Sequence, residues 1–224
     1  MPLNLAGFML LKDCSQIFTL GPQGTFSDEA AQKVRNTGVG VTYTSTFVEA
    51  LVRVSEDPES VAVVPVENSV AGTVAQVQDS LVRYDLLILG EINLPIEYAL
   101  LANAELEQVK LYFSHPQALE QSSGFISKNL GKAQNQFTRS NVDSGIQFLE
   151  AVDSEPEPVA AIVPLSFADR YQKWKCASAI QDYQNNTTRF LVVRSRQANE
   201  QLDFSRKKTS LLVEFQEDRS GLLY

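Results

Sequence analysis

The stretch Val61-Ala-Val-Val-Pro-Val66 runs directly into the polar triplet Glu67-Asn68-Ser69. Six consecutive apolar residues without alternation are typical of a strand that is covered on both faces, as in a parallel sheet flanked by helices. In open α/β sheets, ligands bind beyond the carboxyl ends of the strands. The stretch therefore predicts a helix-covered sheet with a polar site at its edge.

The rest of the chain alternates short β-rich runs with amphipathic helical stretches. We expect strands near residues 17–20, 41, 61–66, 86–94, 96–102, 109–113, 159–163 and 188–193. We expect helices at 26–34, at 47–54, from 116 onward, around 141–152 and at 167–171. Such alternation predicts mostly parallel sheets with helices on their faces. Two successive series of this kind predict an α/β fold of two Rossmann-like lobes with a central cleft.

The expected domain boundaries follow from these two series. We assign residues 15–204 to one two-lobed domain, with lobe 1 formed by about 15–94 plus 188–204 and lobe 2 by about 95–187. The polar segment after Arg194 is typical of a linker, and residues 209–215 predict a strand. A lone strand and a helix start cannot bury a core. Residues 205–224 are therefore expected to be a linker and the incomplete start of a further domain.

The overall charge restricts the classes of partner. The 224 residues carry a formal net charge of −8, which argues against nucleic acid and anionic membranes as electrostatic partners. A small anionic ligand remains possible, because local hydrogen-bond donors can outweigh a remote negative field.

Cysteine usage and the first residues favour a cytoplasmic protein. Cys14 and Cys176 are far apart and the chain has one histidine, so the spacing of a structural metal site is absent. The apolar run at residues 5–11 is too short to span a bilayer and has no basic residue before it. We expect no metal, no membrane association and a reducing compartment.

Several segments place hydroxyls and backbone amides where strands give way to helices. They are Gly21–Ser27, Glu67–Thr73, Ser114–Gln117 and Ser140-Asn141. A helix N-terminus offers free N–H groups and a partial positive charge, and so favours carboxylates and phosphates. Each hydroxyl taken singly is more often a plain N-cap. Glu67 alone is more often solvated, and His115 alone is more often structural.

The stretch Asn185-Asn-Thr-Thr-Arg-Phe190 places two hydroxyls and a guanidinium at the start of an apolar strand. A surface ion pair of Arg189 is one reading, and a grip on a carboxylate is the other. The chain has neither a G-x-G-x-x-G pattern nor a Walker lysine, which argues against a nucleotide site.

In combination these segments carry a family resemblance. GPQGTFSDEA (21–30), VPVENSVAGTV (64–74), GEINLPIEYALLA (90–102), FSHPQALEQS (113–122) and IQDYQNNTTRFLVV (180–193) together resemble prephenate dehydratase. The resemblance runs from about Ile17 to Val193. The tail at 208–224 resembles the opening of the ACT regulatory domain, in which phenylalanine binds as a feedback inhibitor.

The resemblance implies an architecture like that of type II periplasmic binding proteins. It also implies conversion of prephenate to phenylpyruvate without a cofactor or metal, and a homo-oligomeric state of dimer or tetramer. Because the ACT-like tail is short, we expect this chain alone not to show complete inhibition by phenylalanine.

The resemblance also implies roles for individual residues. Thr188 aligns with the catalytic hydroxyl of the family and would donate a hydrogen bond to the departing oxygen. Arg189 would hold a carboxylate, and Glu67 would be catalytic if it were buried, a structural role being the alternative. The expected substrate-binding residues are Thr25, Ser27, Asn68, Ser69, Ser114, His115, Gln117, Ser140, Asn186 and Phe190.

The chain departs from the family pattern in lobe 2. Tyr98 stands where a histidine is common, Ser122 where a cysteine is usual, and Asn141 in place of a threonine. Val163-Pro164 replaces a pair of small or polar residues. These differences leave two alternatives to a prephenate dehydratase. One is an arogenate dehydratase, and the other is a non-catalytic bilobal protein that binds an anionic metabolite.

Overall fold

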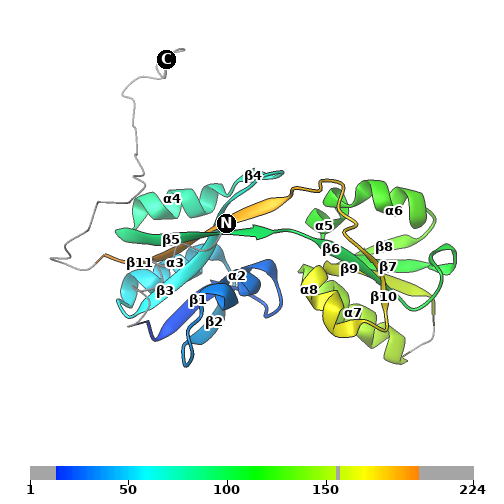
Figure 1. Cartoon of the computed structure of the whole chain (residues 1–224), viewed down its shortest axis with the longest axis horizontal. Coiled ribbons are helices and arrows are strands. Elements are labelled where there is room, and N and C mark those ends of the chain that lie inside the picture. The colour runs from blue at the N-terminus through cyan, green and yellow to red at the C-terminus, as the bar shows by residue number, and fades with distance from the viewer. Residues whose placement is uncertain (1–13, 155–156, 197–224) are drawn as a thin grey trace, which may run out of the picture.

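The chain forms two lobes, each built on one β-sheet with helices packed against it (Figure 1). The computed structural model describes residues 14–154 and 157–196. The elements in chain order are β1 (Gln16–Leu20), α2 (Phe26–Val34), β2 (Gly40–Thr44), α3 (Phe47–Glu56), β3 (Ser60–Asn68), β4 (Gly72–Thr73), α4 (Ala75–Arg83), β5 (Leu86–Pro95), β6 (Tyr98–Ala102), η2 (Leu106–Gln108), β7 (Leu111–Ser114), α5 (Pro116–Gln121), α6 (Ser123–Asn129), β8 (Gln134–Phe137), α7 (Asn141–Ser154), β9 (Val159–Pro164), α8 (Leu165–Ala168), η3 (Asp169–Tyr171), β10 (Lys175–Ser178) and β11 (Thr187–Ser195). The predicted two-lobed α/β architecture is confirmed.

The sheet of lobe 1 has the strand order β2-β1-β3-β11-β5, and the short β4 pairs with β3. Helices α3 and α4 cover one face of this sheet. The even-numbered apolar residues of β3, such as Val64, form a core there with the odd-numbered apolar residues of β11, such as Leu191. Helix α2 covers the other face, on which Val63 and Phe190 lie. The two faces are covered because β3 and its neighbours are apolar on both sides.

The sheet of lobe 2 has the strand order β10-β6-β9-β7-β8. Helix α7 packs on one face with Phe148 fully buried, and α5 and α6 lie over the other face. Strand β9 is buried along its whole length, Val159–Pro164, as its continuous apolar sequence predicts.

Both sheets are mixed, which corrects the expectation of mostly parallel sheets. β1 is parallel to β2 and β3, and β7 is parallel to β8 and β9, each through a crossover that contains a helix. β11 is antiparallel to β3 and β5, and β6 is antiparallel to β9 and β10. Strands β6 and β11 adjoin the passages between the lobes, where no crossover helix is available to return the chain in parallel, and the short β4 forms a separate antiparallel pair with β3.

The chain passes between the lobes twice, and the two passages are bonded to each other. Pro95 at the end of β5 is the register partner of Thr187 at the start of β11. The backbone N–H of Ile96 donates to the carbonyl oxygen of Asn186 at 2.8 Å. Figure 1 shows both passages, from β5 to β6 and into β11, between the two lobes. The residues next to this double passage are therefore held by both lobes.

Three helices begin with the same reciprocal capping arrangement. In each, the hydroxyl of a Ser or Thr accepts a hydrogen bond from the backbone N–H of the acidic residue three positions later. The carboxylate of that acidic residue accepts in return from the backbone N–H of the residue that precedes the Ser or Thr. The pairs are Thr25 with Asp28, Thr46 with Glu49, and Ser140 with Asp143. This arrangement fixes where α2, α3 and α7 begin.

The segments predicted beyond Arg196 lie outside the described residues, including the strand expected at 209–215. Within residues 14–154 and 157–196, helices that combine the length and the apolar character needed to cross a bilayer are absent.

Candidate active site

Thr188 in β11 belongs to a network of buried amide side chains. Nδ2 of Asn68 donates to Oγ1 of Thr188 at 2.9 Å and to Oδ1 of Asn186 at 2.7 Å. Nδ2 of Asn186 in turn donates to Oε1 of Gln121 at 2.9 Å. We call these four residues the amide network, and each is at most 8% exposed. The network joins β3 and β11 of lobe 1 to α5 of lobe 2.

Backbone groups fix the direction of the hydrogen bonds in this network. Oδ1 of Asn68 accepts from the backbone N–H groups of Val70 at 3.0 Å and Ala71 at 2.8 Å. Because backbone N–H groups can only donate, this oxygen must face them, and Nδ2 must face Thr188. The hydroxyl of Thr188 therefore acts as an acceptor toward Asn68 and keeps its own proton for another acceptor.

Arg189 lies on the other face of the sheet from Thr188, because successive side chains of a strand alternate. Its Nη2 lies 3.1 Å from Oε2 of Glu67 and its Nη1 lies 3.6 Å from Oε2 of Glu91. The side chain of Glu67 is 54% exposed. The structure thus brings Arg189 and Glu67 together but does not bring either one into the amide network.

This second face carries a small open cavity of about 180 Å³. It is lined by Glu67, Ser69, Asn93, Thr187 and Arg189. Ser69 also ties the two strand ends together: its Oγ accepts from the N–H of Thr187 at 2.9 Å and donates to the carbonyl of Asn185 at 3.2 Å. The polar residues here stabilise the pairing of β3 with β11.

The lobes touch where α2 meets lobe 2, a region we call the lobe junction. The ring of Phe26 meets the ring of Tyr98 edge-on, with centroids 5.5 Å apart. Tyr98 is fully buried, and burial raises the pKa of its hydroxyl, while a hydrogen bond with the Asn141 side chain opposes that shift. Gly24, at the start of α2, has a positive φ, and a Cβ placed on it would lie 3.1 Å from Nη2 of Arg170.

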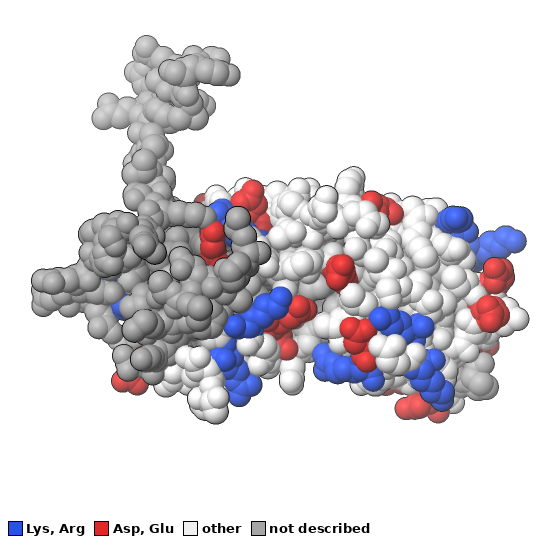
Figure 2. All heavy atoms as spheres, in the orientation of Figure 1, with Lys and Arg blue, Asp and Glu red and all other residues white. Residues whose placement is uncertain are grey.

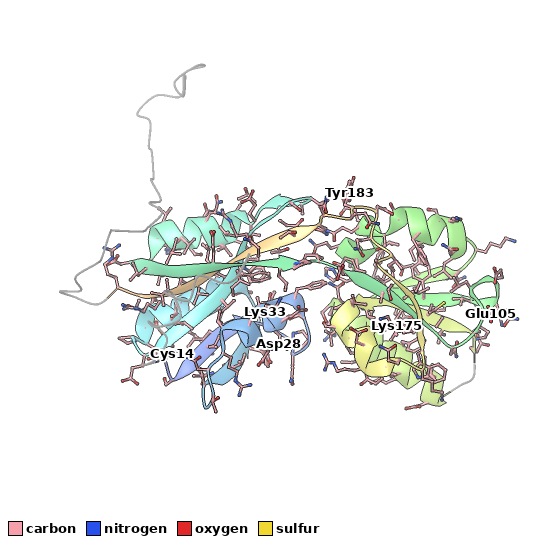
Figure 3. All side chains as sticks on the ribbon, in the orientation of Figure 1. Cys14, Asp28, Lys33, Glu105, Lys175 and Tyr183 are labelled. Atoms are coloured by element: carbon pink, nitrogen blue, oxygen red, sulfur yellow. The ribbon has the colours of Figure 1, made fainter. Side chains whose placement is uncertain are left out.

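Three predicted binding residues lie at the starts of helices α2 and α7. Oγ1 of Thr25 accepts from the N–H of Asp28 and donates to the carbonyl of Pro22 at 3.0 Å. Asp28 is labelled on this helix in Figure 3. Ser27 is buried in the first turn of α2, and Oγ of Ser140 accepts from the N–H of Asp143 at 3.0 Å. In this structure Thr25 and Ser140 act as caps.

The predicted residues of the SHPQ segment lie around the start of α5. Ser114 is fully buried and its Oγ donates to Oδ1 of Asn135 at 2.8 Å. His115 is the N-cap, and its Nδ1 accepts from the N–H of Gln117 at 3.4 Å. Partial burial lowers the pKa of His115. Gln117 itself is exposed.

Two residues of interest were not found from the sequence. Gln121 lies one helical turn after Gln117, a spacing that places both residues on one face of a helix. The sequence does not show, however, that Gln121 accepts a hydrogen bond from Asn186. Arg170 follows a charged residue in a short helical segment, which is typical of a solvated surface. Only the folded structure places it beside Gly24.

Three buried polar atoms of lobe 2 have no hydrogen-bond partner among the described residues, and one of them is Nδ2 of Asn135 in β8. The other two are Oγ of Ser122 and Oδ1 of Asn141, at positions where the sequence departs from the family pattern. In the described ranges, His, Cys, Asp and Glu side chains form no cluster of three that could hold a metal ion.

Comparisons with known protein sequences agree with one another. The sequence profile of the prephenate dehydratase family matches residues 17–198. A prephenate dehydratase of Methanocaldococcus jannaschii is 32% identical over 213 residues, which cover 93% of this chain and 74% of that protein. A bifunctional chorismate mutase/prephenate dehydratase of Neisseria gonorrhoeae is 35% identical over 176 residues, which cover 78% of this chain and 48% of that protein. The chain thus spans about half the length of this bifunctional relative.

Solved structures agree with the sequence comparison. The prephenate dehydratase of Staphylococcus aureus superposes with a TM-score of 0.68 at 31% identity, covering 82% of this chain and 67% of that one. The prephenate dehydratase of Arthrobacter aurescens, solved in complex with L-Phe, superposes with a TM-score of 0.71 at 29% identity, covering 84% of this chain and 62% of that one.

Proposed function

Because the chain belongs to the prephenate dehydratase family, we propose that it converts prephenate to phenylpyruvate with loss of CO₂ and water in phenylalanine biosynthesis. Enzymes of this kind are decarboxylating dehydratases, a class of carbon–oxygen lyase. For this particular chain, the observation that carries the proposal is the hydrogen bond from Asn68 to Thr188, which leaves the threonine proton available.

In the proposed reaction, the atom that most needs stabilisation by the enzyme is the departing hydroxyl oxygen. The bond between the ring and its carboxylate breaks, and its electron pair enters the ring as CO₂ leaves. The ring becomes aromatic as the bond to the hydroxyl on the opposite carbon breaks, and that oxygen departs as hydroxide, which takes up a proton to become water. Aromatisation supplies the driving force, so the enzyme has to hold the dianion and stabilise the charge that develops on the departing oxygen.

We assign that stabilisation to the hydroxyl of Thr188. A threonine is too weak an acid to transfer its proton outright, so it donates a hydrogen bond while water supplies the proton. Asn68 fixes the rotation of the hydroxyl by donating to its oxygen, and Asn186 and Gln121 fix Asn68 from the other lobe. Gln121 and Asn186 are thus positioning residues, which act through Asn68.

We assign Arg189 and Glu67 a structural role in this mechanism, in place of the catalytic roles expected from the sequence. Both face away from Thr188 and neutralise each other at the end of the β3–β11 pair. Phe190, which is 2% exposed, packs under the network on the same face as Thr188 and supports its strand.

We also propose that the enzyme is cytoplasmic, that it forms homo-oligomers and that it acts on free prephenate. Both cysteines are free thiols, as expected in a reducing compartment. Figure 2 shows acidic and basic side chains interspersed over the visible face, and this mixture is compatible with a small soluble substrate.

The proposal is tested by mixing the purified protein with prephenate and following phenylpyruvate by its ultraviolet absorbance at alkaline pH. We expect formation of phenylpyruvate well above the uncatalysed rate. A protein that binds prephenate in calorimetry but forms no product would instead be a binding protein. Turnover of arogenate at a higher kcat/KM than prephenate would reassign the substrate.

A further inference from the structure

We propose that Arg170 binds a carboxylate of the substrate at the lobe junction, an inference that rests on the proposed function. Arg170 belongs to η3 in lobe 2, immediately after α8, and Figure 1 shows this part of lobe 2 facing α2 of lobe 1. Its Nη2 lies so close to Gly24 that a Cβ there would be 3.1 Å away. The guanidinium of Arg170 therefore reaches from one lobe to the other.

The charge of Arg170 is not neutralised within the part of the chain that the structure describes. Its Nε donates a long hydrogen bond, 3.4 Å, to the carbonyl of Ser166, and its guanidinium lies 5.7 Å from the centroid of the Phe167 ring. Its neighbour Asp169 pairs with Lys175 at 2.7 Å. Asp28, the acid nearest to Gly24 in sequence, accepts from Gly24 itself and from Tyr43.

The other candidate for binding a carboxylate is Arg189, whose Nη atoms already face two carboxylates, while its Nε is buried without a hydrogen-bond partner among the described residues. Glu67 and Glu91 lie within ion-pair distance of it, on the sheet face opposite to Thr188. Prephenate carries two carboxylates, and in a chain with a net charge of −8 a local cation would favour their binding alongside neutral hydrogen-bond donors. Arg170 is such a cation, at the junction on the α2 side.

The chemistry of arginine suits this role. A guanidinium presents a planar fork that matches a carboxylate with two parallel hydrogen bonds. The ring of Phe167 lies beneath the fork and restricts its orientation. Because Arg170 comes from lobe 2 and Thr188 from lobe 1, a substrate bound to both would hold the lobes together.

The test compares the variants Arg170→Gln, Arg170→Lys and Lys173→Gln in prephenate turnover. Lys173 is an exposed cation three residues away that stacks on Trp174, so its variant removes the same charge from the same region. We expect Arg170→Gln to raise KM for prephenate about 10-fold or more, as loss of a charge-assisted bidentate contact does, with a smaller change in kcat. Arg170→Lys should recover part of the loss, and Lys173→Gln should match the parent protein.

Inhibition by phenylpyruvate shows which carboxylate is bound, because this product keeps the side-chain carboxylate and lacks the ring carboxylate. A weaker inhibition constant in Arg170→Gln assigns the side-chain group, and an unchanged constant assigns the ring group. An unchanged KM for prephenate in Arg170→Gln overturns the inference.

The inference and the proposed function fail in different ways. If the parent protein turns over prephenate and Arg170→Gln does so equally well, only the inference is wrong. If the parent protein forms no phenylpyruvate, the proposed function is wrong. Calorimetry with prephenate on the parent protein and on Arg170→Gln then decides the inference, since equal binding by both proteins rejects it and weaker binding by the variant supports it.

Discussion

Asn68 and Thr188 are 120 residues apart in the chain, and the carboxamide of the first donates to the hydroxyl of the second at 2.9 Å. Because backbone N–H groups hold the other end of the carboxamide, the threonine proton points away from Asn68. This relationship gives a weakly acidic hydroxyl a fixed direction, which is what stabilisation of a developing charge requires.

Removal of the Thr188 hydroxyl should therefore damage kcat more than KM. We expect Thr188→Ala to lower kcat by about 100-fold or more, as loss of a preorganised donor does in other enzymes. Thr188→Ser keeps the hydroxyl and should retain much more activity. Steady-state rates of phenylpyruvate formation check this, and an unaffected kcat in the alanine variant would remove Thr188 from the mechanism.

Gln121 should matter through Asn186 and Asn68, without touching the substrate. Gln121→Ala leaves the Nδ2 group of Asn186 buried without its acceptor, which costs about 1–3 kcal/mol of stability. We expect kcat to fall while KM changes little, because the orientation of Thr188 is loosened. Glu120→Ala is the matched control, since Glu120 is an exposed residue on the same helix. Equal kinetics in both variants would show that the network does not position the hydroxyl.

The ion pair between Arg189 and Glu67 should contribute little to catalysis. We expect Glu67→Gln to keep kcat within a few-fold of the parent value and to change stability by about 1 kcal/mol or less, as for other exposed ion pairs. Turnover rates and thermal unfolding of the same preparation check both expectations. A loss of several orders of magnitude in kcat would restore the catalytic role that the sequence suggested.

A side chain at Gly24 should displace the guanidinium of Arg170, and Gly38 provides the control. Both have φ near +90°, so Ala costs each about 1 kcal/mol of backbone strain. Of these two positions, only Gly24 brings a Cβ against neighbours, with Nη2 of Arg170 at 3.1 Å, whereas nothing lies within 4 Å at Gly38. We expect Gly24→Ala to raise KM beyond the effect of Gly38→Ala. Similar kinetics in the two variants would mean that the junction adapts without cost.

Acid should weaken the cap that His115 provides to α5. Its folded-state pKa is lowered by burial below the ordinary value of 6.5. As pH falls from above 6.5 toward the lowered value, the unfolded chain binds more protons than the folded chain, so the stability contributed by neutral His115 is lost. Asn caps helices without titrating, and His115→Asn should therefore lose less stability between pH 7.5 and pH 5.5. Chemical denaturation at the two pH values measures this difference.

The sequence predicts those elements whose residues alone determine their structure. Helix α2 has the predicted bounds, Phe26–Val34, because an N-cap and an acidic first turn mark its start. Strands β3 and β9 are found where continuous apolar runs predict them. Strand β8 (Gln134–Phe137) was missed because an edge strand made of polar residues carries no hydrophobic pattern. Helix α4 was missed too, since it lacks a side-chain cap.

The site was harder to predict because its geometry depends on strand pairing. In sequence, Thr188 and Arg189 are neighbours, yet the strand turns them to opposite faces. A register shift between Arg189 and Phe190 leaves Val66 of β3 without a partner in β11, and so brings Glu67 opposite Arg189. Gln121 comes from the other lobe. Residue order alone carries none of these relationships.

The position of β11 in the first sheet has a consequence for how the enzyme is made. β11 is the last described element, yet it lies between β3 and β5. On the ribosome, the five strands of lobe 2 emerge before it, so lobe 2 can close while lobe 1 still lacks an inner strand. The strand that completes lobe 1 also delivers Thr188. If Thr188 acts as proposed, the two lobes cannot turn over prephenate before β11 has paired with β3 and β5, so turnover would report that this strand is in place.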